Sequence, residues 1–251
     1  MDCFPAKYSV NGEGRIAKKV MVGLYTTNSV FDNAVSIPVD MFRFPASRIL
    51  VFCKAPVPGY VKTRLLSDLS PQACADLHVW LSRRILGELS AQQIAPLQLW
   101  CSPNKEHTFF GDCVESFSVT LHQQKGEDLG ARMHFGFVSV LKQYRSAVLI
   151  GCDSPSLSAG DIEEAFTMLD RGKDLVLAPA EDGGYVLVGL TKSQPRLFSD
   201  MPWGNTTVMA ETRLRAEKLE LDFGELPVQW DVDVPEDLRR LTTWVSNEGD
   251  K

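Results

Sequence analysis

The sequence lacks the marks of several large classes of protein. It contains no run of about eighteen apolar residues, the length that a helix needs to span a bilayer. Its first residues show no basic start followed by an apolar core, which is the pattern of a signal peptide. With a formal net charge of -6, it also lacks the basic excess of nucleic-acid-binding proteins. We therefore expect a cytoplasmic protein with no membrane span and no nucleic-acid partner.

Motifs built on cysteine, histidine or serine are missing as well. No CxxC pair occurs, no cysteine and histidine stand at zinc-finger spacing, and there is no GxSxG turn of a serine hydrolase. Cys53 and Cys152 end strand-like runs, where a buried free thiol is the expected state. His78 and His134 fall within predicted helices, where packing or surface positions are the expected roles. Reduced thiols agree with a cytoplasmic protein.

The pattern along the chain predicts one α/β domain. Hydrophobic residues make up 44% and charged residues 23% of the 251 residues, which are ordinary globular values. Short apolar runs alternate with segments of helical period, which favours crossover units and a mostly parallel sheet flanked by helices. The predicted strands are residues 48–52, 97–100, 117–121, 147–151, 174–179 and 185–190. The predicted helices are residues 71–85, 129–144, 158–169, 206–218 and 235–245.

The first part of the chain differs from the rest. Residues 1–47 have scattered charges and no sustained period of two or 3.6 residues. We expect residues 1–40 to be a weakly ordered extension, or an over-extended start with Met41 as the true initiator. The folded domain is predicted to run over residues 48–246.

A basic loop follows the first predicted strand. The stretch "KAPVPGYVKTRL", residues 54–65, contains no acidic residue, although the chain as a whole is acidic. Gly59 permits a close backbone approach, and Lys62 and Arg64 are suited to phosphate oxygens. The loop matches neither a Walker A motif nor GxGxxG. A bound anion and a solvated basic turn both explain it.

Carboxylates follow two further elements. Asp153 stands at the end of the strand-like run 147–151, where a metal ligand, a helix cap and a turn residue are all possible roles. Asp231 and Asp233 precede a helix that begins with proline, and Asp237 lies inside that helix, where a cap or a surface charge explains it. Two carboxylates from separate elements can hold Mg²⁺ or Mn²⁺ together with phosphate oxygens. Facing the basic loop, such an ion would complete a diphosphate site.

Taken together, these stretches resemble a known family. The sequence resembles the small GT-A-like transferases called arsenosugar-biosynthesis glycosyltransferases, or selenodomain-associated transferases, of the nucleotide-diphospho-sugar transferase superfamily. Six segments carry the resemblance, in family order: "VFCKAPVPGYVKTRL" (51–65), "QQKGEDLGARM" (123–133), "LIGCDSPSL" (149–157), "APAEDGGYVLVGL" (178–190), "PWGNTTVMAET" (202–212) and "DVDVPEDL" (231–238). Residues 1–40 lie outside it.

The resemblance implies a single-domain GT-A-like fold and a nucleotide site. The residues implied to hold the nucleotide phosphates are Lys54, Pro58, Gly59, Lys62, Thr63 and Arg64. Asp153 and Asp233 match the family's aspartates for Mg²⁺ or Mn²⁺. Val234 stands where the commoner pattern has threonine, which removes a hydroxyl but no metal ligand.

The other three motifs carry more open assignments. Asp128 or Arg132 would reach the nucleotide, or else Asp128 caps a helix and Arg132 lies on the surface. Asp182 would face the acceptor as a general base. The residues expected on the acceptor side are Gly183, Gly184, Tyr185, Trp203 and Asn205. A hairpin turn, core packing and a helix cap explain the same residues in purely structural terms.

Three functions remain open from the sequence. The first is transfer of a glycosyl group from a nucleotide sugar to a small acceptor, with the metal and Lys62 stabilising the leaving diphosphate. The second is nucleotidyl transfer from a nucleoside triphosphate with release of pyrophosphate. The loop lacks the GxGxR form of many nucleotidyltransferases, which favours the first. The third is a non-catalytic nucleotide-binding protein, which would not need to keep both aspartates.

Overall fold

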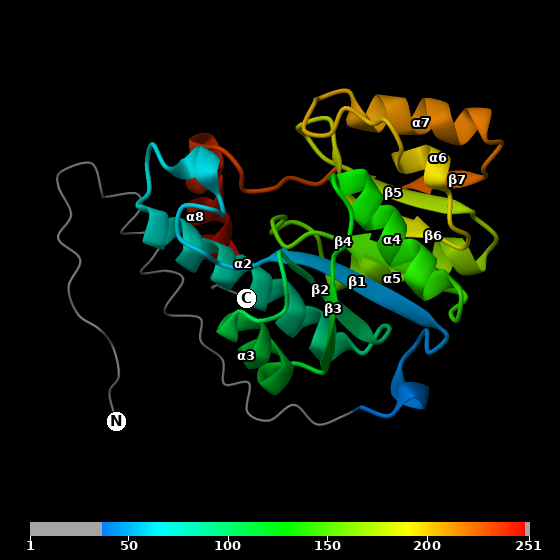
Figure 1. The fold of residues 1–251 in the computed structure, drawn as a ribbon, viewed down its shortest axis with the longest axis horizontal. Coiled ribbons are helices and arrows are strands. Elements are labelled where there is room, and N and C mark those ends of the chain that lie inside the picture. The colour runs from blue at the N-terminus through cyan, green and yellow to red at the C-terminus, as the bar shows by residue number, and fades with distance from the viewer. Residues whose placement is uncertain (1–36, 249–251) are drawn as a thin grey trace.

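The computed structural model describes residues 37–248, which are built around one seven-stranded sheet (Figure 1). The order of the strands across the sheet is β3-β2-β1-β4-β6-β5-β7. Only β6 runs antiparallel to its neighbours, so the sheet is mostly parallel, as predicted. The strands are β1 Ser47–Lys54, β2 Leu97–Ser102, β3 Val119–Gln123, β4 Ser146–Ile150, β5 Leu175–Pro179, β6 Tyr185–Leu190 and β7 Phe223–Glu225.

Helices cover both faces of this sheet (Figure 1). The helices are α2 Pro71–Gln92, α3 Thr108–Ser116, α4 Leu129–Leu141, α5 Ala159–Asp170, α6 Pro195–Phe198, α7 Val208–Lys218 and α8 Pro235–Glu248, with short 3-10 turns η1 Val39–Met41 and η2 Thr63–Leu65. One core cluster joins α2, α3 and α5 to the sheet, and a second joins α4, α6 and α7 to its other face. A third packs η2 and α2 against α8.

Local signals set several of the helix starts. Ser70 accepts a hydrogen bond from the backbone N–H of Ala73, and Pro71 takes the first helical position of α2. Ser158 and Asp161 form a reciprocal capping box at the start of α5. Both starts agree with the sequence prediction. The hydrophobic pattern of the sequence did not predict the helices α3 and α6 or the strand β7.

Part of the predicted N-terminal extension packs against the domain. Phe42 is buried, and the ring of Phe44 stacks on Phe166 at a centroid distance of 5.2 Å. The backbone N–H of Arg43 donates to the carbonyl of Gln93. The remaining prediction of a weakly ordered extension or a later start falls on residues 1–36, which lie outside the described residues.

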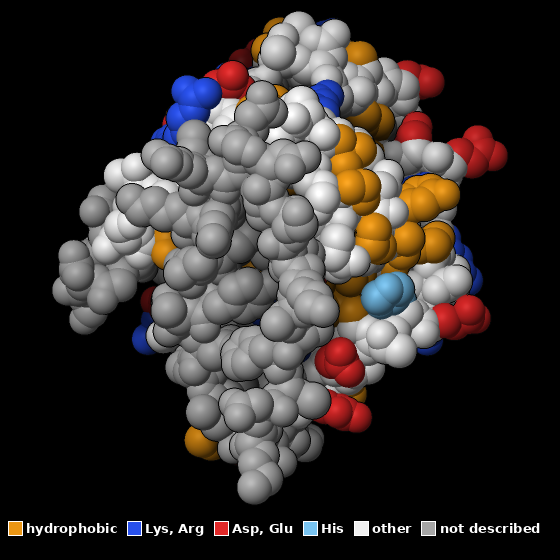
Figure 2. Space-filling view, turned by 90° about the vertical axis from the view of Figure 1, so that its left-hand side faces the viewer, with side chains coloured by type: hydrophobic (Ala, Val, Ile, Leu, Met, Phe, Trp, Pro, Cys, Tyr) orange, Lys and Arg blue, Asp and Glu red, His pale blue; other side chains and the backbone are white. Residues whose placement is uncertain are grey.

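The surface carries both apolar and charged side chains, and the cysteines lie in the interior. On the face shown in Figure 2, hydrophobic side chains gather in a band beside a histidine, with acidic side chains around it. None of the helices within residues 37–248 is long and apolar enough to cross a membrane. All five cysteines in that range are buried and free of disulfides.

Candidate active site

A cavity of about 550 Å³ opens beside the carboxyl ends of β1 and β4. In open α/β sheets, ligands bind in this position, outside the carboxyl ends of the strands. The cavity is lined by the loop after β1, the region up to the first turns of α4, the loop after β4, the start of β6, the segment before α7 and the segment before α8. All six sequence motifs therefore meet in one cavity. Among the described residues that line it, only His78 lies outside those motifs.

Lys62 is the side chain that ties this site together. Its backbone adopts a left-handed conformation with φ of 51°, which turns the chain at the start of η2. The side chain is only 3% exposed, and its Nζ lies 2.7 Å from Oδ1 of Asp153. Nζ also donates to the carbonyl of Val232 at 2.6 Å, while the N–H of Val232 donates to the carbonyl of Asp153 at 3.0 Å. One buried ammonium group thus joins three separate segments.

Asp153 faces the cavity as a carboxylate. Its side chain keeps 47% exposure although Oδ1 is buried. Burial by itself would raise the pKa of Asp153, but the charge of Lys62 and the contact with His78 outweigh it and hold the pKa well below its usual range. Asp153 is therefore ionised at neutral pH, with part of the carboxylate free to contact a ligand.

His78 reaches the site from α2. It is buried, with Nδ1 3.6 Å from Oδ1 of Asp153 and Nε2 2.9 Å from the carbonyl oxygen of Lys54. Burial lowers the pKa of His78, but the neighbouring Asp153 carboxylate raises it by more, so the net pKa lies above its usual value. The sequence predicts packing or a surface position for His78. It is packed, yet it also lines the cavity, which helical period alone does not reveal.

Asp233 lines the cavity from the segment before α8. Its Oδ2 lies 2.7 Å from Nη1 of Arg64, in an exposed ion pair. The backbone N–H groups of Asp233 and Val234 both donate to Oδ2 of Asp237 at 2.9 Å. Asp237 therefore holds the start of α8 in place, as the capping interpretation expected. Asp233 is fixed by its backbone, and its side chain stays 40% exposed.

Asp231 shows how much negative charge this cavity contains. Burial raises its pKa to about 6, and the charges of Asp182, Asp153 and Asp233 contribute, while Lys62 opposes them. These four carboxylates all line the cavity. A protein places like charges so close when a cation or a proton is shared among them.

A divalent cation fits part of this arrangement. No group of three or more His, Cys, Asp or Glu side chains among residues 37–248 is placed to enclose a metal ion. Mg²⁺, however, is often held by only one or two carboxylates together with substrate phosphates and water. Asp153 and Asp233 are two half-exposed carboxylates on one cavity, so the donor set suits an ion that arrives with a phosphate ligand.

The other predicted phosphate contacts divide into two groups. Lys54, Thr63, Arg64 and Arg132 line the cavity beside Lys62. Nε of Arg132 donates to the carbonyl of Gly126 at 3.1 Å, which sets its direction from the first turn of α4. The predicted residues that do not line the cavity are Pro58, Gly59, Asp128 and Gly183. Oδ1 of Asp128 accepts from the N–H of Ala131 at 2.7 Å, so Asp128 caps α4.

The predicted acceptor side is built around a tight turn. Gly183, with φ of +87°, packs so closely that a Cβ there would lie 2.0 Å from the carbonyl oxygen of Thr206. The turn is held further by the N–H of Gly184, which donates to Oδ1 of Asp182 at 2.8 Å. The packing of Gly183 against Thr206 joins the turn before β6 to the segment before α7. Asp182 and Gly184 line the cavity as a result.

Two aromatic residues form the neighbouring wall. The rings of Tyr185 and Trp203 meet edge to face at a centroid distance of 6.2 Å, and both line the cavity. Asn205 also lines it, and its Oδ1 accepts from the N–H of Thr207 at 3.3 Å. Trp203 packs on α4 at Gly130, where a Cβ would lie 2.7 Å from its Nε1. The core-packing and capping interpretations therefore describe real contacts of residues that also face the cavity.

The sequence does not predict a place in this cavity for His78, Asp231, Cys53 or Cys152, all of which line it. Asp231 had a usable signal, because it alternates with Asp233 in the same motif. His78 had none, because its place depends on how α2 packs.

Comparisons with known proteins give one family match and several similar solved structures. A family model described as "Uncharacterized protein conserved in bacteria (DUF2064)" matches residues 85–205. None of the curated proteins matches the chain. A crystal structure from Desulfovibrio desulfuricans G20, described as a "putative nucleotide-diphospho-sugar transferase", is 28% identical with a TM-score of 0.70, covering 82% of this chain and 95% of that one.

Two further solved structures are more distant. A CMP:2-keto-3-deoxy-manno-octonic acid synthetase complexed with CTP has 11% identity and a TM-score of 0.52, covering 80% of this chain and 99% of its own. A 4-diphosphocytidyl-2C-methyl-D-erythritol synthase from Anaerococcus prevotii DSM 20548 has 10% identity and a TM-score of 0.53, covering 81% and 98%. The narrower arsenosugar or selenodomain resemblance stays a prediction. This chain has the single-domain α/β fold shared by nucleotide-diphospho-sugar transferases and cytidylyltransferases.

Proposed function

We propose that this protein transfers a glycosyl group from a nucleotide sugar to a small acceptor, with Mg²⁺ or Mn²⁺ bound beside the diphosphate. The observation that carries the proposal is the cavity in which Asp153 and Asp233 face the cations Lys54, Arg64 and Arg132. Carboxylates and cations around one space suit a metal-bound diphosphate better than any uncharged ligand. The 28% identity with the Desulfovibrio protein supports the same class of donor.

The charged side chains have separate tasks in this proposal. Asp153 and Asp233 would hold the divalent cation, which when bound offsets the charge that develops on the leaving diphosphate. Lys54 and Arg132 would contact phosphate oxygens directly, since neither side chain forms an ion pair within the described residues. Arg64 can contact them too, from its exposed pair with Asp233.

Lys62 would act on the diphosphate mainly through Asp153. Its buried ammonium contacts the carboxylate of Asp153 rather than open cavity space. It would keep Asp153 ionised and aimed at the metal, with a smaller direct role at the phosphates than the sequence alone suggests. Its positive charge still lies within the site, where it lowers the energy of a leaving anion.

Asp182 is the base candidate. Its Oδ1 accepts the N–H of Gly184, which fixes the carboxylate at the cavity wall beside Tyr185 and Trp203. In the proposed step, Asp182 takes the proton of an acceptor hydroxyl as the hydroxyl oxygen bonds to the anomeric carbon, and the bond from that carbon to the diphosphate oxygen breaks. This direct displacement inverts the anomeric centre.

Product analysis tests the proposal. The full chain is incubated with Mg²⁺ or Mn²⁺ and a panel of nucleotide sugars and nucleoside triphosphates, and nucleoside diphosphate and pyrophosphate are measured separately. Metal-dependent release of nucleoside diphosphate from a nucleotide sugar supports glycosyl transfer. Pyrophosphate release that depends on a phosphorylated small molecule would replace it with nucleotidyl transfer. Metal-dependent thermal stabilisation without any product would indicate a nucleotide-binding protein instead.

A further inference from the structure

Three buried cysteines stand in one row across neighbouring strands. In the register of β1 and β2, Cys53 pairs with Cys101. The last pair of β1 with β4 is Val51 with Ile150, and Cys53 and Cys152 each lie two residues beyond it, Cys152 in the loop just after β4. Successive residues of a strand point to opposite faces, so the three thiols lie on the same face of the sheet. All three belong to the same core cluster.

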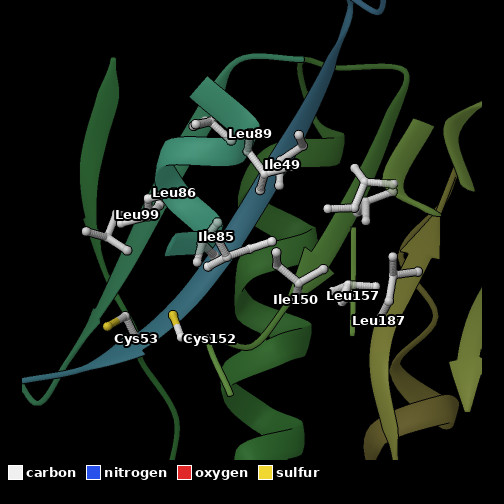
Figure 3. Packing of buried hydrophobic residues seen from close by; sticks show 14 of the residues in the cluster. Ile49, Cys53, Ile85, Leu86, Leu89, Leu99, Ile150, Cys152, Leu157 and Leu187 are labelled. Carbon is white, nitrogen blue, oxygen red and sulfur yellow. The ribbon is translucent and has the colours of Figure 1, made fainter. Parts of the chain in front are cut away.

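Cys53 and Cys152 lie close enough to bond. Neighbouring strands run about 4.8 Å apart, and a disulfide needs Cα atoms about 4.4–6.8 Å apart with both Cβ atoms on one side. Figure 3 shows the two thiols next to each other among the buried hydrophobic side chains. Sγ of Cys152 lies 3.4 Å from the carbonyl oxygen of Phe52, the residue just before Cys53. The register therefore gives the pair the backbone spacing of a potential disulfide, with both side chains in the core on one face of the sheet.

The same pair borders the candidate active site. Cys53 and Cys152 line the cavity, whereas Cys101 does not. Each of the three thiols donates to a backbone carbonyl: Cys53 to Lys54, Cys152 to Phe52 and Cys101 to Leu99. Nε2 of His78 lies 3.6 Å from Sγ of Cys53, and its Nδ1 lies 3.6 Å from Oδ1 of Asp153. Asp153 also follows Cys152 directly in the chain. The two thiols thus lie in the cavity wall beside the charged groups, with Cys53 2% and Cys152 4% exposed.

We propose that Cys53 and Cys152 form a reversible redox site that a peroxide entering the cavity converts to a disulfide. One sulfur attacks the O–O bond of hydrogen peroxide, which gives a sulfenic acid and one water. The second thiol then attacks the sulfenic sulfur, the S–S bond forms, and a second water leaves. The two thiols lose two hydrogens and two electrons, and the peroxide is reduced to two waters.

The disulfide would also alter the neighbouring carboxylate. Closing the S–S bond draws the start of the loop after β4 toward β1, and Asp153 is the next residue of that loop. Oxidation would therefore weaken metal-dependent nucleotide binding. This consequence rests on the proposed function, whereas formation of the disulfide does not.

Peptide mapping tests the redox site. The folded full chain is treated with hydrogen peroxide, free thiols are blocked, and the tryptic peptides are identified by mass spectrometry. We expect a linked peptide that contains Cys53 and Cys152, lighter than the two reduced peptides by two hydrogens, which dithiothreitol separates again. Cys53→Ser and Cys152→Ser should each abolish the link, so either variant suffices if the other fails to fold. Cys101→Ser, in the same row but outside the cavity, should keep it.

Two results would overturn the proposal. The first is a Cys53–Cys101 link in place of the expected one. The second is peroxide-treated folded protein in which both thiols stay reduced. Mn²⁺-dependent binding of UDP before and after oxidation then tests the consequence. Unchanged binding by the oxidised form would refute it, while absence of binding in both forms would count against the proposed function and leave the redox site standing.

Discussion

Replacing Lys62 with methionine removes the charge that joins three segments of the cavity. The methionine keeps most of the buried volume but leaves Asp153 without the ammonium at 2.7 Å and Val232 without its donor at 2.6 Å. Loss of one partner from a fully buried ion pair costs about 3–5 kcal/mol. Asp153 keeps 47% exposure, so water solvates part of the stranded carboxylate, and we expect the lower end of that range, about 3 kcal/mol.

Urea unfolding followed by circular dichroism measures this loss. For a domain of this size, about 3 kcal/mol also corresponds to a fall in Tm of roughly 6–12 °C. Arg64→Met is the matched control, because its ion pair with Asp233 is exposed and should contribute about 0–1 kcal/mol. Similar small losses in both variants would refute the reasoning, since Lys62 would then not hold the site together.

Acid unfolding gives a second test of the same pair. The pKa of Asp153 is lowered in the folded state, so its contribution to stability is present above the unfolded pKa of about 3.9 and is lost as the pH falls below that value. Without Lys62 the folded pKa moves back up. The Lys62→Met protein should therefore show a shallower fall in stability between neutral and acid pH than the wild type. An equally steep fall of stability with pH in both proteins would contradict the ion pair between Lys62 and Asp153.

Three further outcomes are expected. Gly183→Ala should destabilise the fold by about 2–3 kcal/mol in urea unfolding, because the new Cβ would lie 2.0 Å from a backbone carbonyl oxygen. Gly204→Ala, at a φ of +82° but with open space around it, should cost about 1 kcal/mol, and equal losses in the two variants would contradict this reasoning. Burial raises the pKa of Cys101 and Cys113 to about 12, so both stay protonated near pH 8, and iodoacetamide should label them at least about 1000-fold more slowly in folded than in unfolded protein. Asp182→Asn should lower glycosyl transfer by about 100- to 10,000-fold and leave nucleotide affinity unchanged, and a matching loss of affinity would argue against a base.

Much of the fold could be predicted because its signals are local. The apolar run of β4 and the Ser158–Asp161 capping box can be read from adjacent residues. β7 is only three residues long, and its pairing with β5 depends on the course of the chain in between. The antiparallel direction of β6 follows from the hairpin at Gly183, which the sequence did suggest.

The site could be predicted less completely, since its decisive contacts join distant segments. The motifs at the strand ends pointed to one cavity, and Asp153 and Asp233 were expected there. The burial of Lys62 against Asp153 was not, because it depends on a left-handed turn that lysine rarely adopts. His78 reaches Asp153 only through the packing of α2. Asp128 illustrates the opposite case, in which a cap and a ligand share one sequence signature.

The central claim is that Asp153 and Asp233 bind a divalent cation together with a nucleoside diphosphate. Electron paramagnetic resonance of Mn²⁺ measures this directly, with UDP, GDP, ADP or CDP added to the full chain. The account predicts that at least one of these increases Mn²⁺ binding, and that Asp153→Asn weakens the ternary complex at least about tenfold, as loss of a charged metal ligand should. Equal Mn²⁺–nucleotide binding by the wild type and Asp153→Asn would contradict it.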